Sequence, residues 1–144
     1  MTALVASRLI KELATVTTRR FPVAANAAVW EGGMVALSGA GANAVAVPAS
    51  ASAALKVVGV AQADANNLGG ADGALTVEAK VGVFLMNNSA TDPLALGDVG
   101  SPVYAADDNT VSKTGAAAAG VPTQPQAGWL WNIDTSGGVW VRFL

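Results

Sequence analysis

The stretch at residues 94–113, LALGDVGSPVYAADDNTVSK, places several reactive types of side chain close together in the sequence. Asp98, Asp107 and Asp108 supply carboxylates, while Tyr104 and Lys113 add a phenol and an amine. A pair of carboxylates can hydrolyse a glycosidic bond, and a cluster of them can bind calcium. The same residue types beside glycine, proline and asparagine also make tight turns. The stretch is therefore either part of a site or the corner of a small β domain.

Turn formation is the better interpretation of the carboxylates. Nearly all the aspartates of the chain stand beside Gly, Asn, Pro or another turn residue. The calcium alternative at residues 107–109 lacks both the D-x-[DN]-x-[DN]-G spacing and the distant glutamate of a calcium-binding loop. A hydrolytic pair would have to come from Glu31, Asp64, Glu78, Asp92, Asp98, Asp107 and Asp108. We expect these residues to form turns, with no metal site and no catalytic pair.

Other catalytic chemistries lack their reactive groups. The chain of 144 residues contains no histidine and no cysteine, which removes the usual nucleophile and base pairs. A Ser-Lys arrangement is left, but the sequence has no S-x-x-K. The glycines at 39–41 and 69–70 precede no G-K-[ST], so a phosphate-binding loop is not predicted. We expect a protein that is not an enzyme and uses no cofactor.

The composition indicates a body that covers other protein surfaces. Charged residues make up 12% of the chain and hydrophobic residues 52%, much of it alanine. So few charges on a folded domain favour self-association or docking on a larger body. No apolar run approaches the ~20 residues of a membrane span, and Arg8, Lys11 and Glu12 interrupt the apolar start that a signal peptide would need. We expect a soluble protein made inside the cell, with no membrane partner.

Residues 1–20 differ from the rest and are predicted to form a partner-binding arm. Four basic residues against Glu12 give the segment a charge of +3, whereas the remainder carries four basic and nine acidic residues, or −5. Val5, Leu9, Leu13 and Val16 recur at helical spacing, but the segment could also be extended or simply solvated. Nucleic acid is disfavoured, because +3 binds weakly and no aromatic residue is present for stacking. The residues expected to contact the partner are Leu4, Arg8, Leu9, Lys11, Leu13, Arg19 and Arg20.

From residue 21 onward, short apolar runs alternate with turn formers, which predicts an all-β fold, either a small antiparallel barrel or a sandwich. Glycines in DTSGG, residues 134–138, predict a hairpin between the two strands that carry Trp129, Trp131 and Trp140. The expected strands are residues 33–37, 43–47, 56–63, 74–86, 101–106, 109–113, 128–134 and 138–143.

A weak internal repeat runs through these strands. Residues 33–37, 43–45 and 58–61 match residues 100–104, 109–111 and 128–131, with offsets that drift between 66 and 70. Each unit reads as a strand, a turn, a second strand, a loop and a third strand. Two such units could make the two halves of one barrel.

The four tryptophans are the remaining candidates for a binding role. Trp129 and Trp131 are two residues apart, so both point to the same face of their strand. Such a pair can stack on a sugar ring, but packing in a core or an interface is more common. We expect Trp30, Trp129, Trp131 and Trp140 to build the core or an oligomer interface.

Residues 20–144 resemble the small all-β decoration, or cement, proteins of tailed-bacteriophage capsids. The resemblance rests on AVWEGGMVAL followed by KVVGVAQ, on VGVFLM, and on LALGDVGSPVYAADDNTVSK. It implies a β-tulip-like barrel over residues 21–144, with the arm at residues 1–20 facing the capsid. It also implies a structural protein on the outer surface of the virion capsid, which binds the major capsid protein and stabilises contacts between its copies.

In that family a symmetric homo-oligomer is usual, and we expect a homotrimer first and a dimer second. Two alternatives stay open. A β-rich tail or baseplate component would differ in what it touches, and a carbohydrate-binding β module would use Trp129 and Trp131 as an exposed platform.

Overall fold

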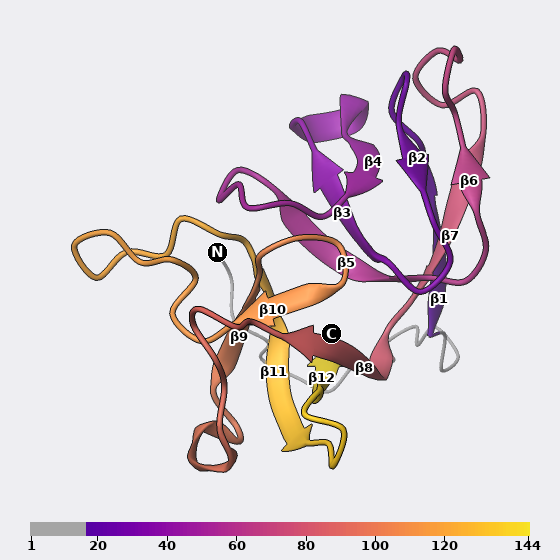
Figure 1. Ribbon diagram of the computed structural model, residues 1–144. Coiled ribbons are helices and arrows are strands. Elements are labelled where there is room, and N and C mark those ends of the chain that lie inside the picture. The colour runs from indigo at the N-terminus through magenta and orange to yellow at the C-terminus, as the bar shows by residue number, and fades with distance from the viewer. Residues whose placement is uncertain (1–16) are drawn as a thin grey trace, which may run out of the picture.

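The computed structural model describes residues 17–144 and is almost entirely β (Figure 1). Two single-turn 3-10 helices, η1 (Gly41–Asn43) and η2 (Leu96–Asp98), are the helical elements of the described range. The predicted all-β class is confirmed. The strands are β1 (Thr18–Pro22), β2 (Ala28–Val29), β3 (Met34–Ser38), β4 (Val45–Pro48), β5 (Lys56–Ala61), β6 (Ala65–Asn66), β7 (Thr76–Lys80), β8 (Gly82–Asn88), β9 (Pro102–Ala105), β10 (Thr110–Ser112), β11 (Gln126–Ile133) and β12 (Val139–Phe143).

Every apolar run that was expected to be a strand contains one, but the run at residues 74–86 is not continuous. It ends as β7 at Lys80 and resumes as β8 at Gly82, which has a φ of 150° that favours glycine. The chain thereby leaves one sheet and enters another. Three strands were not expected: β1, which begins inside the predicted arm, and the two-residue strands β2 and β6, which pair with each other.

The strands form two halves with the same order of pairing. In the first half, residues 18–80, the sheet runs β1-β7-β5-β3-β4. In the second half, residues 82–143, it runs β8-β12-β11-β9-β10 and closes into a barrel through β10 and β8. Position by position, β1 matches β8, β7 matches β12, β5 matches β11, β3 matches β9 and β4 matches β10. The internal repeat is thus present in the topology, but each unit lies in its own sheet rather than in half of one barrel.

The correspondence extends to the closure of each half. We call the closed barrel of the second half the second barrel. It closes where Val111 of β10 lies parallel to Asn88 of β8, and the Ser89 amide donates to the Val111 carbonyl at 2.9 Å. In the first half, Val23 directly after β1 makes a parallel bridge to Ala46 of β4, and the Ala24 amide donates to the Ala46 carbonyl at 2.9 Å. The first sheet is therefore closed at one point by the same type of contact.

A bulge recurs at the same place in each half and explains two glycines. The β3–β5 ladder shifts register beside Gly59, and the β9–β11 ladder shifts beside Gly128. A Cβ on Gly59 would lie 2.7 Å from the Lys80 carbonyl oxygen, and one on Gly128 would lie 2.2 Å from the Arg142 carbonyl oxygen. Neither position has room for a side chain, so both bulges depend on the close approach that glycine permits.

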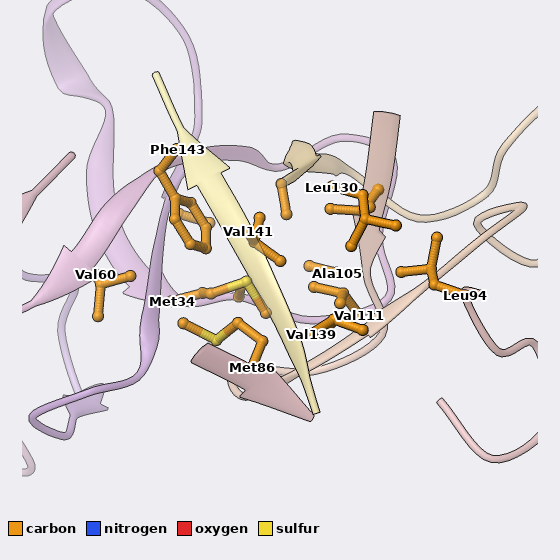
Figure 2. Close-up of a cluster of buried hydrophobic side chains, with 14 residues drawn as sticks. Met34, Val60, Met86, Leu94, Ala105, Val111, Leu130, Val139, Val141 and Phe143 are labelled. Atoms are coloured by element: carbon orange, nitrogen blue, oxygen red, sulfur yellow. The ribbon is translucent and has the colours of Figure 1, made fainter. Parts of the chain in front are cut away.

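The buried hydrophobic side chains form two clusters, one of which joins the halves. One lies within the first half and includes Val35, Val58 and Ala79. The other is drawn in Figure 2 and joins second-half residues such as Leu130 to Met34 and Ala36 of β3 and Val60 of β5.

Strand β3 is consequently buried on both faces. Its residues alternate, so that Val35 contacts the first cluster while Met34 and Ala36, both fully buried, contact the second. The Met34 amide also donates to the Asp108 carbonyl of the second half at 2.6 Å. The two halves therefore pack as one unit.

Candidate interaction surface on the second barrel

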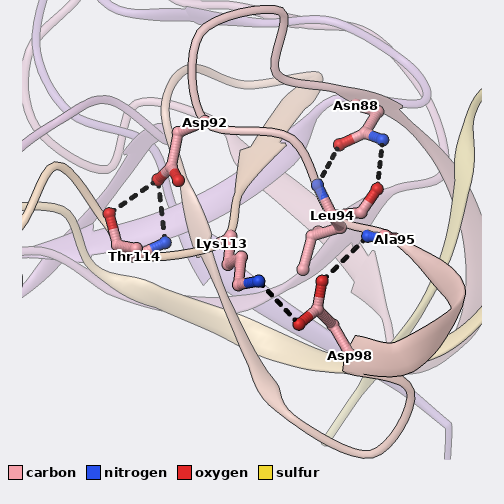
Figure 3. A network of polar contacts seen from close by, with 7 residues as sticks. All are labelled: Asn88, Asp92, Leu94, Ala95, Asp98, Lys113 and Thr114. Carbon is pink, nitrogen blue, oxygen red and sulfur yellow. Dashed lines mark hydrogen bonds and ion pairs between the residues drawn. The ribbon is translucent and has the colours of Figure 1, made fainter.

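The carboxylates of Asp98 and Asp107 form turns, and Figure 3 shows the contacts of Asp98. Asp98 accepts hydrogen bonds from the Ala95 amide and from the Lys113 ammonium group, both at 2.9 Å. The Lys113 contact, and then the Ala95 amide, lower the pKa of Asp98 below 3.8. Asp107 accepts from the amides of Asn109 and Thr110 at 2.9 and 2.7 Å, which closes the turn between β9 and β10. The turn-forming interpretation of these two residues is confirmed.

Three other aspartates, Asp92, Asp64 and Asp72, also bind backbone amides. Asp92 accepts from both the amide and the hydroxyl of Thr114 at 2.8 Å and so ties the loop after β8 to the end of β10 (Figure 3). Asp64 accepts from the Glu31 amide at 2.8 Å, and Asp72 from the Ala25 amide at 2.7 Å. Within residues 17–144, no three acidic side chains gather in a way that could hold a metal ion. These side chains organise loops.

None of the tryptophans lies in the core. Trp30, Trp129 and Trp131 are 50%, 39% and 56% exposed. Trp140 is half-buried, and its indole N–H donates to the Asp134 carboxylate at 3.0 Å. The core half of the tryptophan expectation is therefore corrected, because Trp129 and Trp131 lie on outward-facing positions of β11 and Trp30 lies exposed directly after β2. The interface half stays a prediction.

The outer side of the second barrel carries exposed apolar side chains near Arg142, and we call this surface the aromatic face. In the register of the barrel, Arg142 of β12 stands between Val83 of β8 and Trp129 of β11. From Val83 in β8 and from Trp129 in β11, every second residue points outward, as the exposure of these side chains indicates. The aromatic face consists of Val83, Leu85, Trp129, Trp131, Arg142 and Leu144.

A hollow of about 350 Å³ lies within this face. Trp129 and Trp131 line it together, as expected for two residues on the same side of one strand. Arg142 is the charged side chain at its edge, with its guanidinium carbon 6.0 Å from the centre of the Trp131 ring. The hollow therefore offers aromatic surface and one cation. Its full lining is Gly100, Trp129, Leu130, Trp131, Arg142 and Leu144.

Sequence reasoning identified the two tryptophans but missed Val83, Leu85 and Arg142. The alternation of β12 was visible in the sequence, since VWVRF has period two, whereas VGVFL of the β8 region contains only glycine and apolar residues. What the alternation could not give is which of the two faces lies outside. That depends on which face packs against the core cluster.

The predicted arm is only partly within the described range. Arg19 and Arg20 lie in β1, which pairs with β7 from Thr18 to Pro22. The Arg19 guanidinium donates to the Val58 carbonyl at 2.7 Å, and the Arg20 guanidinium lies 3.3 Å from the Glu78 carboxylate. The boundary at residue 20 is thus corrected, because these two arginines belong to the sheet. The other predicted arm contacts, Leu4, Arg8, Leu9, Lys11 and Leu13, fall outside the described residues.

Comparisons with protein-family models, with curated proteins and with solved structures found no match for this chain. Among residues 17–144, no helix has the length and apolar character needed to cross a bilayer.

Proposed function

We propose that this chain is a structural decoration protein, which binds the outer surface of a tailed-phage head and stabilises contacts between copies of the major capsid protein. The observation that carries the proposal is a charge-poor all-β body with large apolar side chains on its outside. Only 12% of the residues are charged, yet Trp131 and Leu144 are 56% and 68% exposed. Surfaces of this kind suit protein contacts repeated over a lattice, where many weak contacts give avidity.

The use of the acidic side chains supports a structural role over a chemical one. The carboxylates of Asp98, Asp107 and Asp92 bind neighbouring amides, hydroxyls or an ammonium group. Their bonds hold turns that join strands of the second barrel. In the proposal, these turns keep a small scaffold rigid, while residues 1–16 contact the shell.

Co-sedimentation tests the proposal. The purified chain is mixed with empty mature heads, or with isolated tails, of the virus that encodes it, and bound protein is measured in the pellet. We expect saturable binding to heads and none to tails. Binding to tails alone would support the tail or baseplate alternative, and binding to neither would reject the proposal.

A charge-reversal pair tests the part played by the arm. Arg8→Glu together with Lys11→Glu is expected to weaken head binding, because the two new carboxylates would repel an acidic partner surface that the original cations attract. Lys56→Glu is the matched control, since Lys56 is an exposed lysine on β5 outside the arm. Equal binding of all three proteins would show that the arm charges do not contact the shell.

A carbohydrate-binding role is the second candidate, and the exposed pair Trp129 and Trp131 in one hollow favours it. Against it, the side chains lining that hollow offer hydrogen bonds only through Arg142 and two indole N–H groups, none of which is a carboxylate or an amide, whereas a sugar ring needs several hydrogen-bonding groups. A glycan array decides the question. Binding that is lost in Trp131→Ala but kept in Trp30→Ala would establish the sugar site, and an array without signal would remove it.

A further inference from the structure

The described chain begins close to the aromatic face. The Val81 amide donates to the Thr17 carbonyl at 2.8 Å, which continues the β1–β7 ladder by one residue. The β8–β12 ladder pairs Gly82 with Phe143, so the next residue, Leu144, lies opposite the same Val81. Thr17 and Leu144 are therefore about two strand spacings apart, or about 10 Å. The residues that precede Thr17 start from this point.

Leu144 connects this starting point to the exposed tryptophans. It lines the hollow of about 350 Å³ that contains Trp129 and Trp131, and it also lines an adjoining hollow of about 210 Å³ between Trp129 and Val57 of β5. Trp131 and Leu144 are 56% and 68% exposed. The segment before Thr17 therefore begins at the edge of two adjoining hollows whose large apolar side chains are open.

Residues 1–16 are long enough to cover this face. Trp129 and Val83 lie on the strands that flank β12, so the face is about 10 Å wide. The step from Trp129 to Trp131 adds about 7 Å along β11. Sixteen residues span about 24 Å as a helix and more when extended. The segment can therefore cross the whole face from its starting point beside Leu144.

The sequence of residues 1–16 matches the face in apolar character and in charge. Val5, Leu9 and Leu13 recur at every fourth residue, which at helical spacing makes one apolar stripe. Glu12 is the only carboxylate among these residues, and three positions after Leu9 it flanks the stripe. The face offers one cation, Arg142, at the edge of its larger hollow. An apolar stripe beside one carboxylate thus complements aromatic rings beside one guanidinium.

We propose that residues 1–16 dock back on the aromatic face of the same chain, with their apolar stripe against the two tryptophans. Removal of the open rings from water drives the docking. At helical spacing Lys11 lies opposite the stripe and Arg8 lies beyond its margin, so the docked segment presents both cations outward. The inference rests on the proposed function only for the use of these cations, which there contact the shell.

Fluorescence quenching by acrylamide tests the inference on the full chain. In a Trp30→Phe background, the three remaining tryptophans all belong to the second barrel. Leu9→Asp with Leu13→Asp should lower the docked population more than about tenfold, because each new carboxylate would be buried against apolar rings, and quenching should rise accordingly. Leu4→Asp with Ile10→Asp is the matched control, because it adds the same charges outside the stripe and should leave quenching unchanged.

Three results of this experiment would overturn the inference. Equal quenching in the background protein and in both double variants would show that the segment does not cover the rings. A rise of the same size in the two double variants would show that the stripe is not the contact. Protection that is lost on dilution would assign the cover to a second copy of the chain rather than to the chain itself.

A spin label provides a second measurement that leaves the stripe and the face intact. The chain contains no cysteine, so Ser7→Cys creates a single attachment site for a nitroxide, and at helical spacing Ser7 lies opposite the stripe. In a proton–nitrogen NMR correlation spectrum, the nitroxide should broaden the indole N–H signals of Trp129 and Trp131. The signal of Trp30, which lies in the first half, should stay sharp. Sharp signals from all these indoles would overturn the inference.

Head binding is scored separately from docking. A chain that coats heads while its tryptophans stay open would reject the docking and leave the proposed function standing. A chain that docks its segment but binds no heads would reject the proposed function and leave the docking standing.

Discussion

Replacing Gly128 by alanine should destabilise the second barrel strongly, because the new Cβ would lie 2.2 Å from the Arg142 carbonyl oxygen. The nearest tolerated approach is about 3.0 Å, so the two strands must separate by at least 0.8 Å. Overpacking of this kind costs about 1–3 kcal/mol, and each weakened ladder hydrogen bond adds about 1 kcal/mol. We therefore expect a loss of about 3 kcal/mol in the free energy of unfolding.

This loss converts to a shift in melting temperature. An unfolding entropy of about 2.1 cal/mol/K per residue gives about 0.3 kcal/mol/K for a chain of 144 residues, so Tm should fall by about 10 °C. Differential scanning calorimetry measures it. Gly97→Ala is the matched control, since a Cβ there meets no atom within 4 Å, and its Tm should change by at most about 2 °C.

Gly59→Ala provides an internal check from the first half. Its Cβ would lie 2.7 Å from the Lys80 carbonyl oxygen, and its φ of 149° is also unfavourable for alanine. Gly59→Ala should therefore lower Tm by clearly more than the change of at most about 2 °C expected for the control Gly97→Ala. If both bulge variants melt within about 2 °C of the wild type, the steric account of the two bulges is refuted.

Three further outcomes are expected. Met34→Ala should cost about 2–5 kcal/mol in urea unfolding, because this fully buried side chain joins the halves, whereas Leu68→Ala at a 64% exposed site should cost little; equal effects would contradict that assignment. The pKa of Asp98 is lowered in the folded state, so the contribution of Asp98 to stability is complete above pH 3.8 and is lost as the pH falls through the lowered value. Asp98→Asn should therefore flatten the acid part of the curve of stability against pH. An unchanged curve would show that the contact with Lys113 is not maintained. Residues 82–144 expressed alone should give no dispersed NMR spectrum, because their core lacks its first-half members, and a well-dispersed spectrum would show an independent barrel.

Much of the fold follows from local pattern. Alternation in VWVRF and the turn formers in DTSGG are sufficient to place β12 and the hairpin before it. Asp107 beside Asp108 and Asn109 is sufficient to place the turn after β9. In each case the residues that decide the structure are neighbours in the chain, so the sequence displays the whole cause.

Other features depend on partners far away in the sequence. Strands β2 and β6 have two residues each, which is too few to show any periodicity. They form because the fold brings Val29 beside Ala65. Residues 74–86 form one apolar run, and the turn at Gly82 sends its second part into another sheet. Arg19 and Arg20 look like arm residues until β7 is placed beside them.

The sequence by itself determined the all-β class, the turns and a doubled pattern of strands, because each of these is written in residues close to one another. Tertiary structure alone decided that the two units form separate sheets, that β3 is buried on both faces, and that Trp129 and Trp131 point outward. The physical reason is that alternation tells which side chains share a face of a strand, whereas burial of that face depends on which other strand packs over it.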